Sequence, residues 1–95
     1  MPYVKKVVVL QGQIGNILRS ARFQAVAAGL EPHELRKAVV SELAAHLIDI
    51  SVIGVRPAPP GAPGDYELQW QLPGGGPFNK QWFNVGPPRS GREAN

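Results

Sequence analysis

The apolar residues change their spacing within residues 32–55, PHELRKAVVSELAAHLIDISVIGV. From Leu35 to Leu47 they recur every fourth position, which is the spacing of one face of a helix. Pro32 suits the first turn of that helix, where its missing amide has no partner to lose. From residue 48 apolar and polar residues alternate, which is typical of a strand with one buried face. This stretch therefore predicts a helix followed directly by a strand.

The residues ahead of this stretch divide into an apolar run and an amphipathic segment. Residues 3–10 are rich in β-branched valine, so they predict a first strand. From Ile14 to Ala25 the apolar residues recur at helical spacing, and Gly29 supplies a stop. We therefore expect a strand and a helix before residue 32.

The second half of the sequence holds most of the 11 glycines and 10 prolines. Residues 57–64 are rich in both and predict an exposed loop, because proline lacks the amide that helices and interior strands need. Apolar and polar residues alternate over residues 66–72, and residues 78–85 follow after a Pro-Gly turn. These two segments predict a β-hairpin.

Together the segments predict one small α+β domain with the element order β-α-α-β-β-β. Two helices are expected to pack on one face of a mostly antiparallel sheet, because helices and sheets bury their apolar faces against one another. The domain is expected to span residues 1–88, with the loop at 57–64 inside it, and residues 89–95 are expected to form a flexible tail.

The composition limits the class of protein. A chain of 95 residues has room for one hydrophobic core. The sequence contains no cysteine, which excludes disulfides and thiolate metal sites and fits the reducing cytoplasm. No apolar run approaches the roughly 20 residues that a membrane-spanning helix needs, so we expect no membrane role. The abundance of Ala, Gly, Pro and Arg suggests a GC-rich bacterial or phage genome.

The sequence motifs do not favour catalysis, a cofactor or a metal. Residues 12–16, GQIGN, resemble a phosphate-binding turn, but they lack the third glycine of a dinucleotide site and the lysine of a P-loop. Glu42, His46 and Asp49 have helical spacing, which a solvated helix face explains better than a metal site. The serines lie outside any nucleophile-elbow pattern. We therefore expect a non-enzymatic protein.

The predicted hairpin carries aromatic residues that cannot all face the core. Trp82 and Phe83 are adjacent, so they point to opposite faces of a strand. Either the loop at 57–64 or the proline-rich tail covers the outer aromatic, or that aromatic anchors a protein partner. The sequence thus favours a protein-interaction module, such as an adaptor, an accessory subunit or an inhibitor, and an unpaired edge strand could also support a homo-oligomer. The predicted partner-binding residues are Trp70, Phe78, Trp82 and Phe83.

The charge distribution suggests an alternative. The net charge is +3, the sequence pI is about 9.7, and the excess of basic residues lies in the first half. Such residues can neutralise phosphates, and they can equally be solubilising surface charge. The alternative is a nucleic-acid-binding domain whose phosphate contacts come from Lys5, Lys6, Arg19, Arg22, Arg36 and Lys37.

Overall fold

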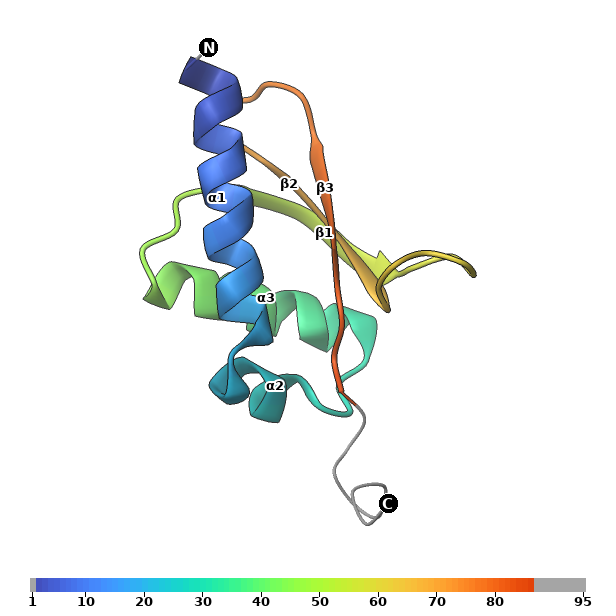
Figure 1. Cartoon of the computed structure of the whole chain (residues 1–95). Helices are drawn as coiled ribbons and strands as arrows, with labels where there is room; N and C mark the ends of the chain where they lie inside the picture. The colour runs from blue at the N-terminus through green and yellow to red at the C-terminus, as the bar shows by residue number, and fades with distance from the viewer. Residues whose placement is uncertain (1, 87–95) are drawn as a thin grey trace.

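The computed structural model describes the backbone of residues 2–86 and the side chains of residues 5–86. The predicted tail at 89–95 and the last two residues of the predicted domain, 87–88, lie outside the described residues. In the described part three helices precede three strands (Figure 1). The elements are α1 (Pro2–Arg19), α2 (Ala21–Ala27), α3 (Pro32–Ala45), β1 (Ser51–Pro57), β2 (Tyr66–Gln71) and β3 (Asn79–Phe83).

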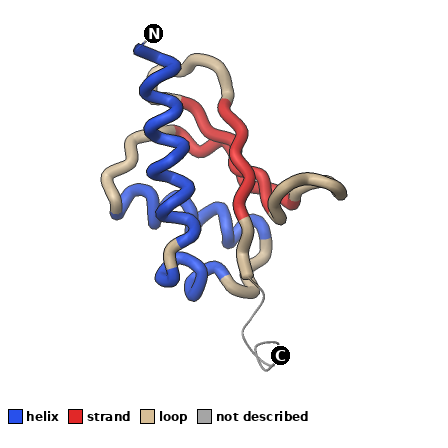
Figure 2. Tube along the Cα trace, in the orientation of Figure 1, coloured by secondary structure: helices blue, strands red, loops and turns tan. Residues whose placement is uncertain are grey.

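The helices form one layer and the strands form another (Figure 2). The sheet is antiparallel with the order β1-β2-β3. α1 packs against β3, α3 packs against β1, and the short α2 lies against both longer helices. The predicted α+β class, with helices packed on an antiparallel sheet, is confirmed.

The predicted first strand is wrong, because residues 3–10 belong to α1. Val7, Ile14 and Leu18 lie along one stripe of this helix and are buried, whereas the two valines that follow Val7 are 60% and 53% exposed. A buried stripe with helical period therefore outweighs the strand propensity of consecutive valines. The element order of the described residues is α-α-α-β-β-β, and not β-α-α-β-β-β.

Short side-chain contacts mark the ends of the helices. The hydroxyl of Ser20 accepts a hydrogen bond from the amide of Phe23 at 3.1 Å, which starts α2 where α1 ends. α3 begins at Pro32 as predicted, and Glu31 and Glu34 form a reciprocal capping box there. Leu47 has a left-handed backbone (φ 60°), so the chain turns after α3 and β1 begins at Ser51, later than predicted.

The core lies between the two layers. Leu68 and Trp70 of β2 are fully buried, as the alternation of residues 66–72 predicted. Phe83 of β3 meets Phe23 of α2 in an edge-to-face contact with 6.5 Å between the ring centroids. The other buried apolar side chains are Val7, Ile14, Leu18, Ala27, Leu35, Val39, Leu43 and Val55.

Candidate interaction site

The four predicted partner-binding aromatics divide between the core and the surface. Trp70 is fully buried, and Phe83 is 6% exposed and stacks with Tyr66 at a centroid distance of 5.6 Å. Phe78 and Trp82 are 61% and 38% exposed. Two of the four aromatics are therefore accessible to a partner, while the other two pack inside the domain.

Trp82 belongs to a row of side chains that crosses all three strands. The register sets Glu67 of β2 opposite Arg56 of β1 and opposite Trp82 of β3. Directly opposite residues in antiparallel strands share a face, and this face is the one that Leu68 and Phe83 do not use. Gln69 and Lys80 stand opposite each other in the next row. We call the surface formed by Arg56, Glu67, Gln69, Lys80 and Trp82 the open face.

Glu67 is the charged centre of the open face. Its Oε1 accepts hydrogen bonds from Nε of Arg56 at 2.7 Å and from Nε2 of Gln69 at 3.0 Å, and only 3% of the residue is exposed. These two bonds, that from Gln69 first, lower the pKa of the Glu67 carboxyl below its ordinary value, although burial acts to raise it. Arg56 neutralises the resulting carboxylate. Within the described residues Lys80 forms no ion pair, so it gives this face a net positive charge.

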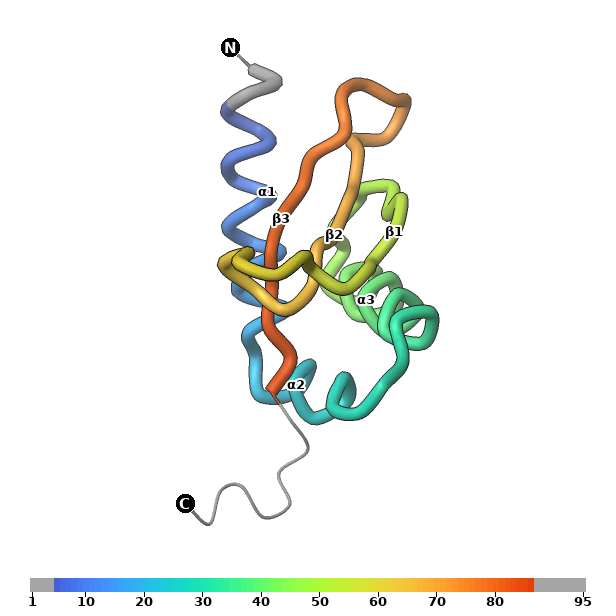
Figure 3. Tube along the Cα trace, turned by 90° about the vertical axis from the view of Figure 1, so that its right-hand side faces the viewer, coloured from blue at the N-terminus to red at the C-terminus, as the bar shows by residue number. Residues whose placement is uncertain are grey.

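The loop between β1 and β2 reaches the open face beside Trp82. In Figure 3 this loop crosses in front of β3, and the amide of Asp65 donates to the carbonyl of Phe83 at 3.1 Å. A Cβ added at Gly64 would lie 2.9 Å from Cβ of Trp82. The backbone therefore passes so close to Trp82 that only glycine fits. The loop therefore packs against the base of the Trp82 side chain, and the residue as a whole is 38% exposed.

The six basic residues of the nucleic-acid alternative lie on three helices. Lys5 and Arg19 are 14 positions apart on α1, which is about 21 Å along the helix axis. Nε of Arg22 donates to Oε2 of Glu42 at 3.1 Å, and Nη2 of Arg36 donates to the carbonyl of Val52 at 3.3 Å. Lys6 and Lys37 are exposed on α1 and α3. The structure does not gather Lys5, Lys6, Arg19, Arg22, Arg36 and Lys37 into one tract.

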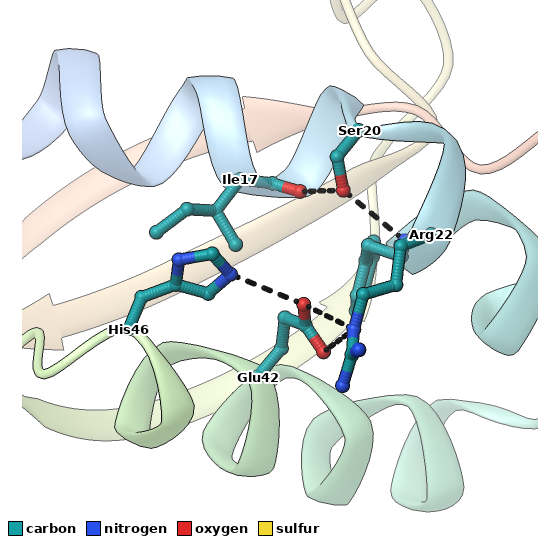
Figure 4. A network of polar contacts seen from close by, with 6 residues as sticks. Ile17, Ser20, Arg22, Glu42 and His46 are labelled. Carbon is teal, nitrogen blue, oxygen red and sulfur yellow. Dashed lines mark hydrogen bonds and ion pairs between the residues drawn. The ribbon is translucent and has the colours of Figure 1, made fainter.

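Glu42 joins α3 to α2. Its side chain is 7% exposed, its carboxylate accepts the bond from Arg22, and Nε2 of His46 lies 3.3 Å from Oε2 (Figure 4). Asp49, the third residue of the spacing noted in the sequence, follows the end of α3. Among residues 5–86 no group of three His, Cys, Asp or Glu side chains is placed to hold a metal ion. The contacts of Glu42 and His46 serve helix packing.

The structure also changes the interpretation of residues 12–16, which the sequence had likened to a phosphate-binding turn. The glycines lie inside α1 and not at a turn between a strand and a helix. Backbone amides in the interior of a helix already donate to the preceding turn, so they are not free to bind phosphate. The segment is helical structure without the geometry of a phosphate loop.

Several residues of the open face were not predicted as site residues from the sequence. Lys80 and Trp82 are two positions apart on β3, so strand alternation could have placed this cation beside the aromatic. The pairing of Arg56 with Glu67 depends on the register of β1 and β2, and the contact of Gly64 with Trp82 depends on the path of the loop. Neither has a local sequence signal.

Comparisons with other proteins identify no function for this chain, so a function must be argued from the geometry of the candidate site. No helix within residues 2–86 is long and apolar enough to cross a lipid bilayer. The chain matches no protein-family model, no curated protein and no solved structure. The candidate site therefore rests on the residues of the open face themselves.

Proposed function

We propose that this chain is a non-catalytic protein-interaction module, of the adaptor, accessory-subunit or inhibitor kind, and that its open face binds a partner protein. Trp82 is the anchor, and Phe78, which directly precedes β3, is a second exposed aromatic. The observation that carries the proposal is the contrast within β3, where Trp82 is 38% exposed and Phe83 is 6% exposed. The fold buries Phe83 in its core and leaves the neighbouring Trp82 partly exposed to water.

The surroundings of Trp82 suit an anchor. Tryptophan is enriched among the residues that dominate binding energy, and the 38% of Trp82 that is exposed is the part a partner can cover. Gly64 lies against Cβ of Trp82, and Glu67 stands opposite Trp82 on β2, so the base of the side chain has little room to move. A side chain that is already ordered loses less entropy on binding. Gln69 and Lys80 supply polar groups at the margin of the contact.

The test compares proteins retained from a lysate of the source organism by three immobilised forms of the chain. The forms are the natural sequence, Trp82→Ala and the control Val26→Ala, which shortens a half-exposed apolar side chain on α2. We expect a protein that the natural sequence and the control both retain and that Trp82→Ala loses. Circular dichroism must show the same folded spectrum for all three.

Two results would count against the proposal. In one, Trp82→Ala retains the same proteins as the natural sequence. In the other, Trp82→Ala unfolds the domain, which would mean that the indole serves stability and that the interface lies elsewhere.

Nucleic acid is the second candidate ligand. The observation in its favour is Lys80, which adds a cation to the face that carries Trp82, and single-stranded nucleic acid binds surfaces that combine cations with stacking aromatics. The six basic residues on the helices could add phosphate contacts. This candidate predicts that the bound material absorbs at 260 nm and is released by salt. It also predicts that the affinity falls less steeply with increasing salt concentration after Lys80→Ala. Partner binding that is insensitive to salt contradicts it.

The setting that we propose is the reducing cytoplasm, with which a sequence without cysteine is compatible. Self-association through an unpaired edge strand is a further mode of assembly for the same chain. Light scattering at two salt concentrations separates a monomer from a dimer.

A further inference from the structure

A hollow of about 240 Å³ lies between α3 and β1, away from Trp82. Arg36, Val40 and Ala44 of α3 line one side, and Ile48 and Ile50 of the connection to β1 line the other, together with Val52 of β1. Val40 is 40% exposed at the rim, while Leu43 beneath it belongs to the core. The hollow is therefore a groove between α3 and the segment that leads into β1, lined by apolar side chains and one cation, with polar and apolar surface in similar amounts.

The strand that borders this groove has a free edge. β1 pairs with β2 on one side, and within residues 2–86 no strand pairs with its other side. The register shifts between Val52 and Gly54, so a bulge interrupts the pairing with β2 at this point. An unpaired edge presents backbone amides and carbonyls that a further strand can use. The groove and the free edge lie together, because Val52 contributes to both.

Arg36 gives the groove its charge preference. Its Nη2 donates to the carbonyl of Val52 at 3.3 Å, a long bond between exposed groups. Among residues 5–86 no carboxylate pairs with Arg36 or with Lys37 next to it, and no acidic residue lines the groove. A carboxylate that approaches this edge can form a charge-assisted bond with Arg36, which is stronger than a bond to a neutral carbonyl.

We propose that the groove and the free edge of β1 bind an extended acidic segment of a partner protein, which adds to the sheet as a fourth strand. Alternate apolar side chains of the segment enter the groove against Val40 and Ile50, and a carboxylate pairs with Arg36. Main-chain bonds along the edge supply affinity, and the groove supplies specificity, as in other complexes formed by strand addition. This site goes beyond the proposed function of the open face and does not depend on it.

The test starts from a displayed library of random dodecapeptides, selected on the whole chain. We expect enriched peptides in which apolar residues alternate and at least one position is Asp or Glu. Fluorescence anisotropy then measures the affinity of the best peptide for the natural sequence and for two groove variants, Arg36→Glu and Val40→Arg. The first reverses the charge, and the second fills the groove while it keeps the site basic. We expect each variant to weaken binding about tenfold or more, which corresponds to about 1.4 kcal/mol or more.

Each variant has a matched control outside the groove. Lys37→Glu makes the same charge change as Arg36→Glu at the next position of α3, and Val26→Arg makes the same substitution as Val40→Arg at an exposed valine of α2. We expect the controls and Trp82→Ala to bind the peptide within about twofold of the natural sequence. NMR shifts of the natural sequence map the contact without any variant, and we expect them over residues 36–44 and 48–54.

Four outcomes would overturn the proposal. The selection enriches no peptide, or the enriched peptide binds equally to the groove variants and to their controls. Alternatively, the NMR shifts fall on residues 80–82, which would assign the peptide to the open face. If Arg36→Glu and Val40→Arg instead convert a dimer of the chain into a monomer, the edge pairs with a second copy and not with an acidic segment.

Discussion

The guanidinium of Arg56 and the carboxylate of Glu67 meet across β1 and β2, with 2.7 Å between Nε and Oε1. The side chain of Glu67 is only 4% exposed, whereas that of Arg56 is 64% exposed. The register sets Glu67 directly opposite Trp82. A desolvated carboxylate that depends on Arg56 and Gln69 therefore stands beside the proposed anchor, and changes to this pair report on both the stability and the shape of the open face.

The stability of the domain should depend on the ionisation of Glu67. The bonds from Gln69 and Arg56 lower the pKa of this carboxyl in the folded protein below its ordinary value of 4.5. A lowered folded pKa contributes stability that is complete above 4.5 and is lost as the pH falls below 4.5 toward the folded pKa. Urea denaturation should therefore show that the free energy of unfolding declines as the pH falls through that window. The decline should be smaller in Glu67→Gln than in the natural sequence. Asp49→Asn is the control for the loss of a carboxylate. Equal declines in the natural sequence and in Glu67→Gln would contradict this assignment.

The two adjacent aromatics of β3 should differ in their effect on stability. Phe83 packs against Phe23 and Tyr66, so Phe83→Ala should lower the free energy of unfolding by about 3–5 kcal/mol. Trp82 is partly in water, so Trp82→Ala should cost only about 1–2 kcal/mol. The midpoints of urea denaturation measure both. A larger loss for Trp82→Ala than for Phe83→Ala would mean that the indole belongs to the core.

The contact of the loop with the open face depends on Gly64. Gly64→Ala places a Cβ 2.9 Å from Cβ of Trp82 and 3.1 Å from the amide nitrogen of Phe83, so either the loop or β3 must move. We expect a loss of about 1–3 kcal/mol in the free energy of unfolding. Gly54→Ala is the control, because a Cβ at that position meets no atom within 4 Å. Equal thermal midpoints for the two variants would show that the loop does not pack on Trp82.

Arg22 should contribute to stability, unlike an ordinary surface cation. Its bond to Glu42 holds α2 to α3, and the carboxylate has little other access to water. Arg22→Ala should lower the free energy of unfolding by about 1 kcal/mol, whereas Lys37→Ala should change it by less than about 0.5 kcal/mol. Thermal denaturation of the two variants checks this. If Arg22→Ala and Lys37→Ala have the same midpoint, Arg22 is free to serve a ligand, as the nucleic-acid alternative requires.

The sequence predicted those elements whose periodicity is local. The four-residue spacing from Leu35 onward identified α3, and the alternation around Leu68 and Trp70 identified β2 and its buried face. The prediction of a strand at residues 3–10 was wrong because Val7, Val8 and Val9 have a high local propensity for strands. Their true state depends on a stripe that continues to Ile14 and Leu18 and packs on the rest of the domain.

The candidate site was only partly predictable for the same reason. Alternation required Trp82 and Phe83 to face opposite ways, but it could not decide which one was outside. That choice depends on the register between β2 and β3, where Phe83 stands opposite Tyr66 on the core side. The burial of Glu67, the contact at Gly64 and the groove beside α3 arise between segments far apart in the sequence, so no local pattern contained them.

Fluorine NMR of the chain labelled with 5-fluorotryptophan tests the central claim most directly, since the sequence contains two tryptophans. Trp82→Phe assigns the two resonances, and the spectrum is recorded with and without the protein that the natural sequence retains from lysate. We predict that the Trp82 resonance is sensitive to solvent in the free chain and shifts when the partner is added, while the Trp70 resonance is unchanged. A Trp82 resonance that does not respond to the partner would contradict the assignment of the open face as the binding site.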